Sequence, residues 1–199
     1  MVRHGESESN RDNCFAPNGE IPLTELGRQQ AREVAAQIAR LFNPQRIISS
    51  TFTRARQSGD IISDTLNLPL EVVEGIQERD LGSLKGQPWH QHTVLTKADP
   101  DYDPQREWLW RPPGGESYED VRRRVMPVLE SLRSRYATEE LVIVSHGAVM
   151  RAIWSQLTGA WIDSFIPRNC SLLVIPHDGH QFLAPRVIET QATNAYEEQ

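Results

Sequence analysis

The sequence has little of several features that would assign it to a specialised class of protein. It contains only two cysteines, Cys14 and Cys170, which cannot build a disulfide framework or a cysteine-rich metal site. No apolar run approaches the roughly 18 residues of a transmembrane helix, and charged residues follow Val2 directly, where a signal peptide would turn apolar. We therefore expect a cytoplasmic protein with free thiols and no membrane partner.

An excess of positive charge is also absent. The formal net charge is −6, which argues against nucleic acid as a partner. A cationic pocket remains compatible with an acidic surface, because a cleft focuses the field of its own charges. The chain has 199 residues, of which 38% are hydrophobic, and we expect a single domain over residues 1–199.

Strand-like and helix-like patterns alternate along the chain without internal repeats. This alternation predicts an α/β fold, a three-layer sandwich with a mostly parallel central sheet flanked by helices. The expected strands are residues 46–50, 70–73, 141–144, 171–175 and 182–188. The last two are expected to form a strand pair. Its outer edge offers unpaired backbone groups to a second copy of the chain, so a homodimer is one alternative. The polar tail after Thr190 is expected to fray.

The expected helices have clear start and stop signals. Thr24 can cap a helix whose apolar face includes Ile38 and Leu41, and Ser117 can cap another over the next four turns. Two more helices are expected over residues 54–66 and from Gly147 to near Gly159. The charge run 122–124 is interpreted as a solvated helix face.

Residues 87–113 break this alternation. The segment holds five prolines and three tryptophans, which are Pro88, Pro100, Pro104, Pro112, Pro113, Trp89, Trp108 and Trp110. Prolines disfavour regular structure, whereas tryptophan is unusual in disordered segments. We expect an ordered but irregular lid over a functional site. His90 and His92 alternate within it but have no third ligand nearby, so they do not predict a metal site.

Polar residues follow three of the expected strands. These groups are Arg3-His4-Gly5, Ser49-Ser50 with Arg54 close behind, and Ser145-His146-Gly147. Because the carboxyl ends of parallel strands meet at one edge of a sheet, we expect these side chains to converge. Two histidines with arginines form a compact cationic pocket suited to a phosphoryl group. Glu78, after the strand at 70–73, would add a carboxylate, with Glu74 and Asp80 as rivals.

The residues Arg3-His4-Gly5-Glu6-Ser7, with Asn10, resemble the signature of the histidine phosphatase superfamily, which includes cofactor-dependent phosphoglycerate mutases. Five further matches follow in the same order. They are Pro22-Leu23-Thr24-x-x-Gly27, Ser49-Ser50 with Arg54-Ala55, Glu78-x-x-x-Gly82, Pro113-Gly114-Gly115-Glu116-Ser117 and Ser145-His146-Gly147. Each motif alone is a weak match, but six in register cover nearly the whole chain.

The resemblance implies a role for each residue. His4 would attack phosphorus and carry a phosphohistidine intermediate, while Arg3, Arg54 and His146 hold and neutralise the phosphoryl oxygens. Glu78 would act as general acid and then general base. Asn10 and the Gly147 amide would be secondary phosphate donors. The implied substrate is a small-molecule phosphate ester, and no metal or other cofactor is implied.

Departures from the mutase pattern favour hydrolysis. Leu81 stands where mutases carry a tyrosine, and Ala148 stands where they often carry an asparagine. Arg106 and Arg111 are separated, whereas mutases tend to have an adjacent arginine pair. We therefore expect a metal-independent phosphomonoesterase. The alternatives are a 2,3-bisphosphoglycerate-dependent phosphoglycerate mutase, an inactive binding module on the same fold, and a metallohydrolase that uses the two histidines and the glutamate as ligands.

Overall fold

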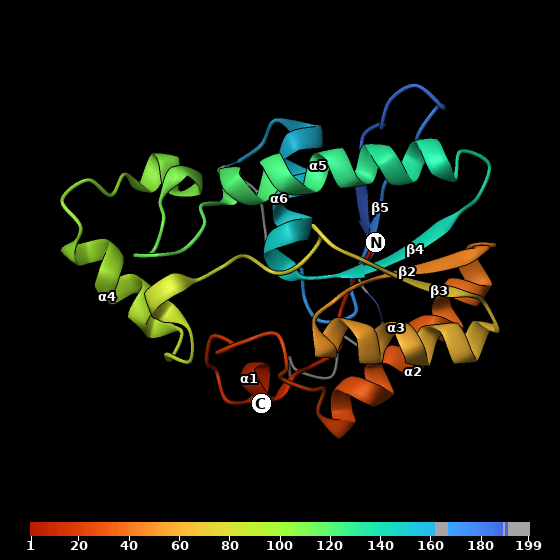
Figure 1. Cartoon of the computed structure of the whole chain (residues 1–199), viewed down its shortest axis with the longest axis horizontal. Helices are drawn as coiled ribbons and strands as arrows, with labels where there is room; N and C mark the ends of the chain where they lie inside the picture. Colours follow the sequence, from red (N-terminus) through yellow and green to blue (C-terminus); the bar gives the residue numbers. More distant parts are fainter. Residues whose placement is uncertain (162–166, 189, 191–199) are drawn as a thin grey trace.

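The computed structural model describes residues 1–161, 167–188 and 190, and these form a six-stranded sheet with helices on both sides (Figure 1). The strand order is β3-β2-β4-β1-β5-β6. The strands are β1 (Val2–Arg3), β2 (Arg46–Ser50), β3 (Leu70–Val73), β4 (Leu141–Ser145), β5 (Leu172–Val174) and β6 (Arg186–Ile188). The first four in this order are parallel, and β5 pairs antiparallel with both β1 and β6, which confirms the mostly parallel sheet. The tail after Thr190 lies outside the described residues.

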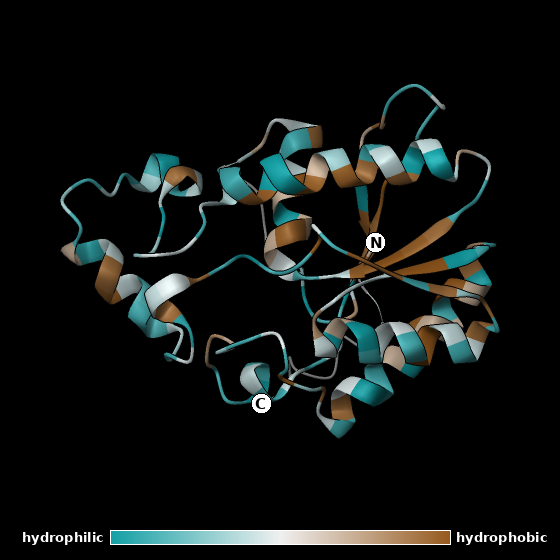
Figure 2. Ribbon diagram, in the orientation of Figure 1, coloured by the Kyte–Doolittle hydropathy of each residue, from teal (hydrophilic) through white to brown (hydrophobic). Residues whose placement is uncertain are grey.

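Helices cover the two faces of the sheet in pairs. In Figure 1, α2 (Glu25–Leu41) and α3 (Thr53–Leu66) lie on one side, and α5 (Tyr118–Arg135) and α6 (Gly147–Thr158) on the other. Successive residues of a strand point to opposite faces of the sheet. Ile47 therefore packs in the core with α2 and α3, and Ile48 packs in the core with α5 and α6. Figure 2 shows the result as hydrophobic strands between helices with hydrophilic outer surfaces.

Local signals set the helix boundaries. The Thr24 hydroxyl accepts a hydrogen bond from the Gly27 amide at 3.0 Å, and Ser117 forms a capping box with Asp120 at the start of α5. The apolar face of α2 is confirmed as far as Ile38, but Leu41 is 51% exposed. The expectation for Leu41 was wrong because α2 ends at this residue. Among the described residues, no helix has both the length and the apolarity to cross a membrane.

The lid is more regular than its proline content predicts. Residues 87–113 contain α4 (His90–Ala98) and the 3-10 helix η2 (Pro104–Leu109), and a second 3-10 helix, η1 (Gly82–Leu84), precedes them. The expectation of an irregular segment was wrong for α4 and η2, because Pro88 and Pro100 flank α4 and Pro104 sits in the first turn of η2, where no N–H is needed. It was right for Pro112 and Pro113, which follow η2 outside any helix or strand. Two contacts order the segment: the Trp110 indole donates to Asp99 at 2.9 Å, and Trp108 stacks on Trp161.

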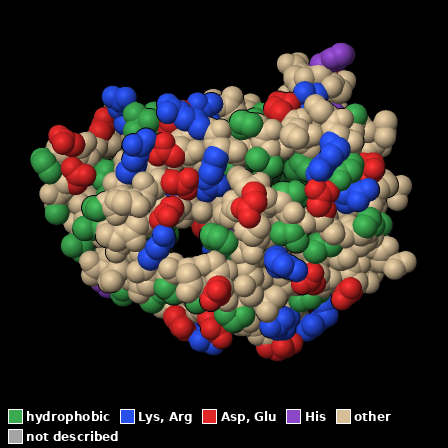
Figure 3. Space-filling view, in the orientation of Figure 1, with side chains coloured by type: hydrophobic (Ala, Val, Ile, Leu, Met, Phe, Trp, Pro, Cys, Tyr) green, Lys and Arg blue, Asp and Glu red, His purple; other side chains and the backbone are tan. Residues whose placement is uncertain are grey.

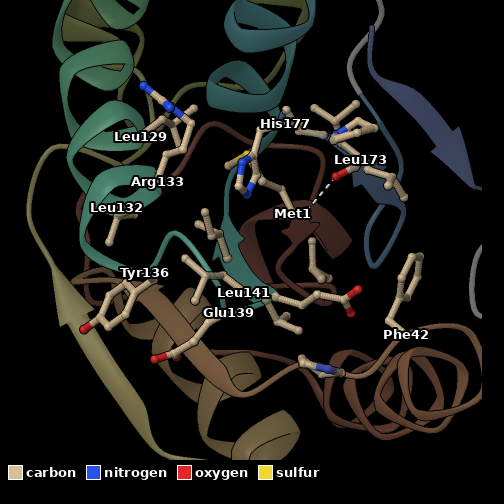
Figure 4. Close-up of a pocket in the computed structure, with 18 of the residues that line it drawn as sticks. Met1, Phe42, Leu129, Leu132, Arg133, Tyr136, Glu139, Leu141, Leu173 and His177 are labelled. Carbon is tan, nitrogen blue, oxygen red and sulfur yellow. Dashed lines mark hydrogen bonds between the residues drawn. The ribbon is translucent and has the colours of Figure 1, made fainter. Parts of the chain in front are cut away.

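A cavity of about 400 Å³ lies at the amino-terminal end of β4 (Figure 4). Its lining is largely apolar and includes Leu132, Leu141 and Leu173, and the Met1 amino group donates to the Leu173 carbonyl at 2.6 Å. The polar residues expected to converge follow the carboxyl ends of the strands, at the opposite edge of the sheet. The functional site is therefore separate from this cavity.

Candidate active site

His4 leaves the end of β1 with its imidazole fixed in one tautomer. Its Nδ1 lies 2.7 Å from the Gly5 carbonyl oxygen. A carbonyl can only accept, so Nδ1 carries the proton and Nε2 keeps its lone pair. The Arg54 Nε–H donates to that Nε2 at 3.1 Å. Burial, together with the charges of Arg54 and Arg3, lowers the pKa of His4 well below 6.5, so the ring is neutral at pH 7.

Close backbone packing holds the turn that carries His4. A Cβ on Gly5 would lie 2.2 Å from the Gly27 carbonyl oxygen, and one on Gly27 would lie 2.0 Å from the Glu6 carbonyl oxygen. Only glycine at both positions lets the start of α2 press against this turn. The Gly5 amide also donates to the Ser58 hydroxyl at 3.1 Å. The motif at residues 22–27 thus supports the turn that carries His4.

His146 follows β4, directly before α6, and lies beside His4. The two ring centroids are 5.2 Å apart at an interplanar angle of 62°, so the rings meet edge to face. The Ser50 hydroxyl lies 2.9 Å from His146 Nε2, which fixes the ring orientation. His146 is fully buried, and burial, with the charge of Arg54, lowers its pKa well below 6.5. The sequence pointed to Ser50 only as part of a motif. In the structure, its hydroxyl orients the His146 ring.

Two arginines enter the same point from different elements. Arg3 lies on β1 and donates through Nη1 to the Pro167 carbonyl at 2.7 Å. Arg54 lies in the first turn of α3 and is 3% exposed, and burial lowers its pKa to about 10, which leaves it cationic at pH 7. Three buried nitrogens here have no hydrogen-bond partner in the described part of the chain: Arg3 Nε, Arg54 Nη1 and His146 Nδ1. Buried polar atoms are rarely unpaired, so this group is suited to bind an anion.

Glu78 is the carboxylate that reaches this group. Its Oε1 accepts from the Arg79 amide at 2.8 Å and from the Ala148 amide, at the start of α6, at 3.2 Å. Its charge also acts on Arg3 and Arg54. The two rivals have other partners, since Asp80 pairs with Lys85 and Glu74 hydrogen-bonds Gln77.

Arg124 is a site residue that the sequence interpretation missed. The run 122–124 was assigned to a solvated face, and Arg122 and Arg123 do pair with Glu119 on the surface. Arg124 instead turns inward, donates to the Glu78 carbonyl oxygen at 3.1 Å, and pairs with Glu116 at 2.8 Å. The assignment failed because the loop after β3 packs beside Arg124 and supplies its hydrogen-bond acceptors. Helical periodicity alone does not predict where that loop lies.

The predicted secondary donors lie at the cavity wall. Gly147 is the first residue of α6 and lines the cavity, as does Asn10. The Asn10 side-chain oxygen accepts from the Ser7 amide at 3.1 Å and caps the short helix α1 (Glu8–Arg11). Asn169, which the sequence did not single out, donates to the same oxygen and also to the His4 carbonyl at 2.8 Å.

The cavity around these residues has a volume of about 1070 Å³. Figure 3 shows the surface hollowed where, in Figure 1, the lid faces α1 and α6. The lid contributes Trp89, His92 and Glu107 to the lining. Trp110 packs inside the lid instead, and Trp108 stacks on Trp161. Arg106 and Arg111 are not in the lining, and Arg111 pairs with Asp120 at 2.6 Å.

The metallohydrolase alternative requires a cluster of ligands. Within residues 1–161, 167–188 and 190, no group of three or more His, Cys, Asp or Glu side chains is arranged to hold a metal ion. The ring nitrogens of His4 and His146 instead contact one arginine, one serine and a backbone carbonyl. The chemistry of this donor set therefore fits an anion better than a cation.

Comparison with known proteins agrees with this geometry. Residues 1–190 match the family model described as histidine phosphatase superfamily (branch 1). An uncharacterized phosphatase of Bacillus subtilis, PhoE, is 30% identical over 80% of this chain and 76% of its own length. A metal-independent phosphoserine phosphatase of Arabidopsis thaliana is 32% identical over 80% of this chain and 68% of its own. A probable phosphoglycerate mutase of Salmonella paratyphi C, GpmB, is 30% identical over 96% and 90%.

Solved structures share the fold. A mycobacterial glucosyl-3-phosphoglycerate phosphatase superposes with a TM-score of 0.78 at 24% identity and covers 94% of this chain and 95% of its own. A phosphoserine phosphatase from Entamoeba histolytica, in complex with 3-phosphoglyceric acid, has a TM-score of 0.78 at 22% identity, with 96% of each chain covered. These likenesses confirm the three-layer α/β architecture.

Proposed function

Because the chain belongs to the histidine phosphatase superfamily, branch 1, we propose that it hydrolyses a small phosphate ester through a phosphohistidine on His4. It is an enzyme of the histidine phosphatase type. One observation carries the finer proposal. A neutral imidazole, whose unprotonated Nε2 accepts from Arg54, lies beside three buried nitrogens that have no partner in the described chain.

In the first step, the His4 Nε2 lone pair attacks phosphorus while the bond from phosphorus to the ester oxygen breaks. Arg3, Arg54 and His146 bind the phosphoryl oxygens as charge moves onto them. Donors held in place before the reaction are worth about 3–4 kcal/mol each in comparable sites. Glu78, in its protonated form at this step, gives its proton to the departing oxygen and is left as a carboxylate, so the product leaves as a neutral alcohol.

In the second step, water replaces the alcohol. Glu78 takes a proton from the water, whose oxygen attacks phosphorus as the bond from phosphorus to Nε2 breaks. Phosphate is released and His4 returns to its neutral tautomer. Arg124 supports both steps, since it holds the Glu78 backbone next to the cavity.

The trapping of the intermediate tests this mechanism. Rapid quenching with a labelled substrate should give a phosphoprotein that is stable in base and labile in acid, because its phosphorus is bound to an imidazole nitrogen. Peptide mapping should place the label on His4. A base-labile, acid-stable label on serine would refute the mechanism and leave the fold assignment intact.

We propose hydrolysis rather than isomerisation. Leu81 and Ala148 line the cavity, and Arg111 is held by Asp120, so neither the tyrosine and asparagine nor the paired arginines of the mutase pattern are present. Two relatives that are named phosphatases support this choice. A third relative is named a probable phosphoglycerate mutase, so that activity is the alternative to test. 3-Phosphoglycerate with a bisphosphoglycerate primer separates the two: free phosphate supports the phosphatase, and 2-phosphoglycerate supports the mutase.

We also propose that the reaction needs no metal. The guanidinium groups of Arg3 and Arg54 supply the positive charge that a metal ion would otherwise give, and the buried His146 adds a third unpartnered nitrogen beside them. Phosphate release should persist after dialysis against a chelator and should be strongly inhibited by vanadate. Loss of activity with the chelator, restored by one divalent metal, would overturn this part of the proposal.

A further inference from the structure

The segment before β5 runs along the turn that carries His4. Over residues 167–171 it makes several hydrogen bonds to Arg3 and His4. Its backbone contributes the Pro167 carbonyl, which accepts from Arg3 Nη1 at 2.7 Å. Asn169 contributes through its side-chain amide, which donates to the His4 carbonyl oxygen at 2.8 Å. The segment therefore holds the chain at the end of β1, where the nucleophile of the proposed mechanism lies.

A strained turn lies next to Asn169. Cys170 has a φ of 61°, in the left-handed region, although it is not a glycine, and its side chain is fully buried. A residue with a Cβ adopts this conformation only where its surroundings impose it, and such strain is concentrated at functional sites. In this conformation the Cys170 amide donates to the Arg3 carbonyl at 3.0 Å. The turn thus presses the segment against β1 and keeps the Asn169 side chain beside His4.

One peptide group, between His4 and Gly5, is held at both of its ends. Its carbonyl oxygen accepts from Asn169 at 2.8 Å. Its N–H, that of Gly5, donates to the Ser58 hydroxyl at 3.1 Å. Because a peptide group is planar, these two hydrogen bonds together fix its rotation. The next carbonyl along the chain, that of Gly5, is the acceptor for His4 Nδ1, so this clamp also fixes the group that sets the tautomer of the ring.

The Asn169 amide also reaches Asn10. It donates to Asn10 Oδ1 at 3.3 Å, and the Ser7 amide donates to the same oxygen at 3.1 Å. Both neighbours are N–H donors, so the atom between them is the oxygen of the Asn10 side chain, and the nitrogen takes the other position. Asn10 lines the cavity, and its Nδ2 has no hydrogen-bond partner in the described part of the chain. That N–H donor is therefore available to a phosphoryl oxygen.

Resting on the phosphatase function proposed above, we propose that Asn169 is a positioning residue for the reaction. One contact of its amide holds the His4 carbonyl and so keeps Nε2 directed at phosphorus. The other contact holds the Asn10 oxygen and so keeps Asn10 Nδ2 directed at the phosphoryl group. Asn169 is not among the residues that line the cavity, so it acts through these two residues and not on the substrate.

Two substitutions of Asn169 test this role with p-nitrophenyl phosphate as substrate. Asn169→Ala removes the donors and should lower kcat about 10-fold, with KM changed by at most about twofold, since this is the size of effect expected for one or two lost hydrogen bonds. Asn169→Asp keeps the shape but places carboxylate oxygens against two acceptors, so kcat should fall further. If Asn169 only fills space, Asn169→Asp would be the more active of the two, and the proposal would be overturned.

The matched controls are Asn43→Ala and Asn43→Asp, which make the same changes at an exposed asparagine before β2. Neither should change kcat. Urea unfolding of every variant separates a loss of activity from a loss of fold.

The tautomer of His4 is a second readout, and it does not depend on turnover. ¹⁵N NMR of the imidazole rings, with the His4 signals assigned from their absence in His4→Gln, should show the wild-type proton on Nδ1 alone. Asn169→Ala should give a mixture of tautomers, as should Ser58→Ala, which frees the other end of the same peptide group. The double variant should lose less kcat than the product of the two single losses, because both act on one group. An unchanged tautomer in Asn169→Ala, or losses that multiply in full, would overturn the proposal.

Failure of the phosphatase function looks different. A wild type that releases no phosphate from p-nitrophenyl phosphate and forms no trapped phosphohistidine overturns the proposed function itself, whatever the tautomer of His4. An active wild type whose kcat is retained in Asn169→Ala overturns only the role of Asn169.

Discussion

His4, Arg54 and His146 at the phosphoryl end of the cavity are 2%, 3% and 0% exposed, whereas Trp89 in the lid half is 43% exposed. The first half is built from strand ends and the first turns of α3 and α6, which the sheet holds in place. The second half comes from α4 and η2, whose contacts with the body include the stack of Trp108 on Trp161 and the ion pair of Glu107 with Arg151. The groups proposed for the chemistry thus lie on the half that the sheet holds rigid, and the lid forms the more exposed half.

If this division holds, the largest effect follows from removing the nucleophile. His4→Ala should lower kcat by at least about 10⁴-fold for every ester, because it removes the Nε2 lone pair that would attack phosphorus. Phosphate release and the trapped intermediate measure it. His180→Ala, in the loop after β5, is the control and should keep full activity. Equal activity of His4→Ala and the wild type would show that the rigid half does not contain the nucleophile.

The same division explains what the sequence could predict. His4, His146 and Arg54 were correctly expected to converge, because parallel strands end at one edge of the sheet whatever covers its faces. Their neighbours Ser58 and Asn169 could not be expected, since their contacts depend on how α3 and the segment before β5 pack. Such contacts depend on the distances between helices and strands, and hydrophobic periodicity and motif spacing do not predict those distances.

The lid was predicted in position but not in structure. Its prolines suggested irregular chain, yet α4 forms between Pro88 and Pro100, with the edge-to-face contact of His92 and Trp110 supporting it. No motif predicted Arg151, which lines the cavity and pairs with Glu107 of the lid, a residue distant in sequence.

A smaller loss, about 100-fold in kcat, is expected for Arg54→Lys. Lysine keeps the charge but lacks the planar fork, so the donor from Nε to His4 and the unpaired Nη1 are both lost. Steady-state kinetics with p-nitrophenyl phosphate measures it. Arg56→Lys makes the same change two residues along α3 at an exposed position and should leave kcat unchanged. If the Arg54→Lys variant has the kcat of the wild type, Arg54 contributes only its positive charge.

A loss of about 10-fold is expected for Arg124→Gln, and its dependence on the leaving group is the informative part. Arg124 holds the backbone of Glu78, so a displaced Glu78 protonates the departing oxygen poorly. Glycerol 3-phosphate needs that proton, whereas p-nitrophenol is a good leaving group and needs it little. We expect the 10-fold loss for the first ester and at most about a twofold loss for the second.

The control for this experiment is Arg123→Gln, which removes the neighbouring exposed guanidinium. It should affect neither ester. If Arg124→Gln slows both esters equally, Arg124 supports the cavity as a whole and does not act through Glu78.

The smallest effect concerns stability rather than turnover and appears only in acid. His4 and His146 have pKa values well below 6.5 in the folded protein because both rings are buried beside Arg54. As the pH falls through 6.5, the unfolded chain therefore binds protons that the folded protein does not, and the free energy of unfolding decreases. Above pH 6.5 this contribution is complete. Urea unfolding at a series of pH values should show the decrease in the wild type, a weaker decrease in the double variant His4→Gln with His146→Gln, and no change of slope in His180→Gln, whose side chain is exposed. If the free energy of unfolding of the double variant decreases as much as that of the wild type, the acid sensitivity comes from groups outside the rigid half. The contrast between the two halves of the cavity would then rest on the kinetic variants alone.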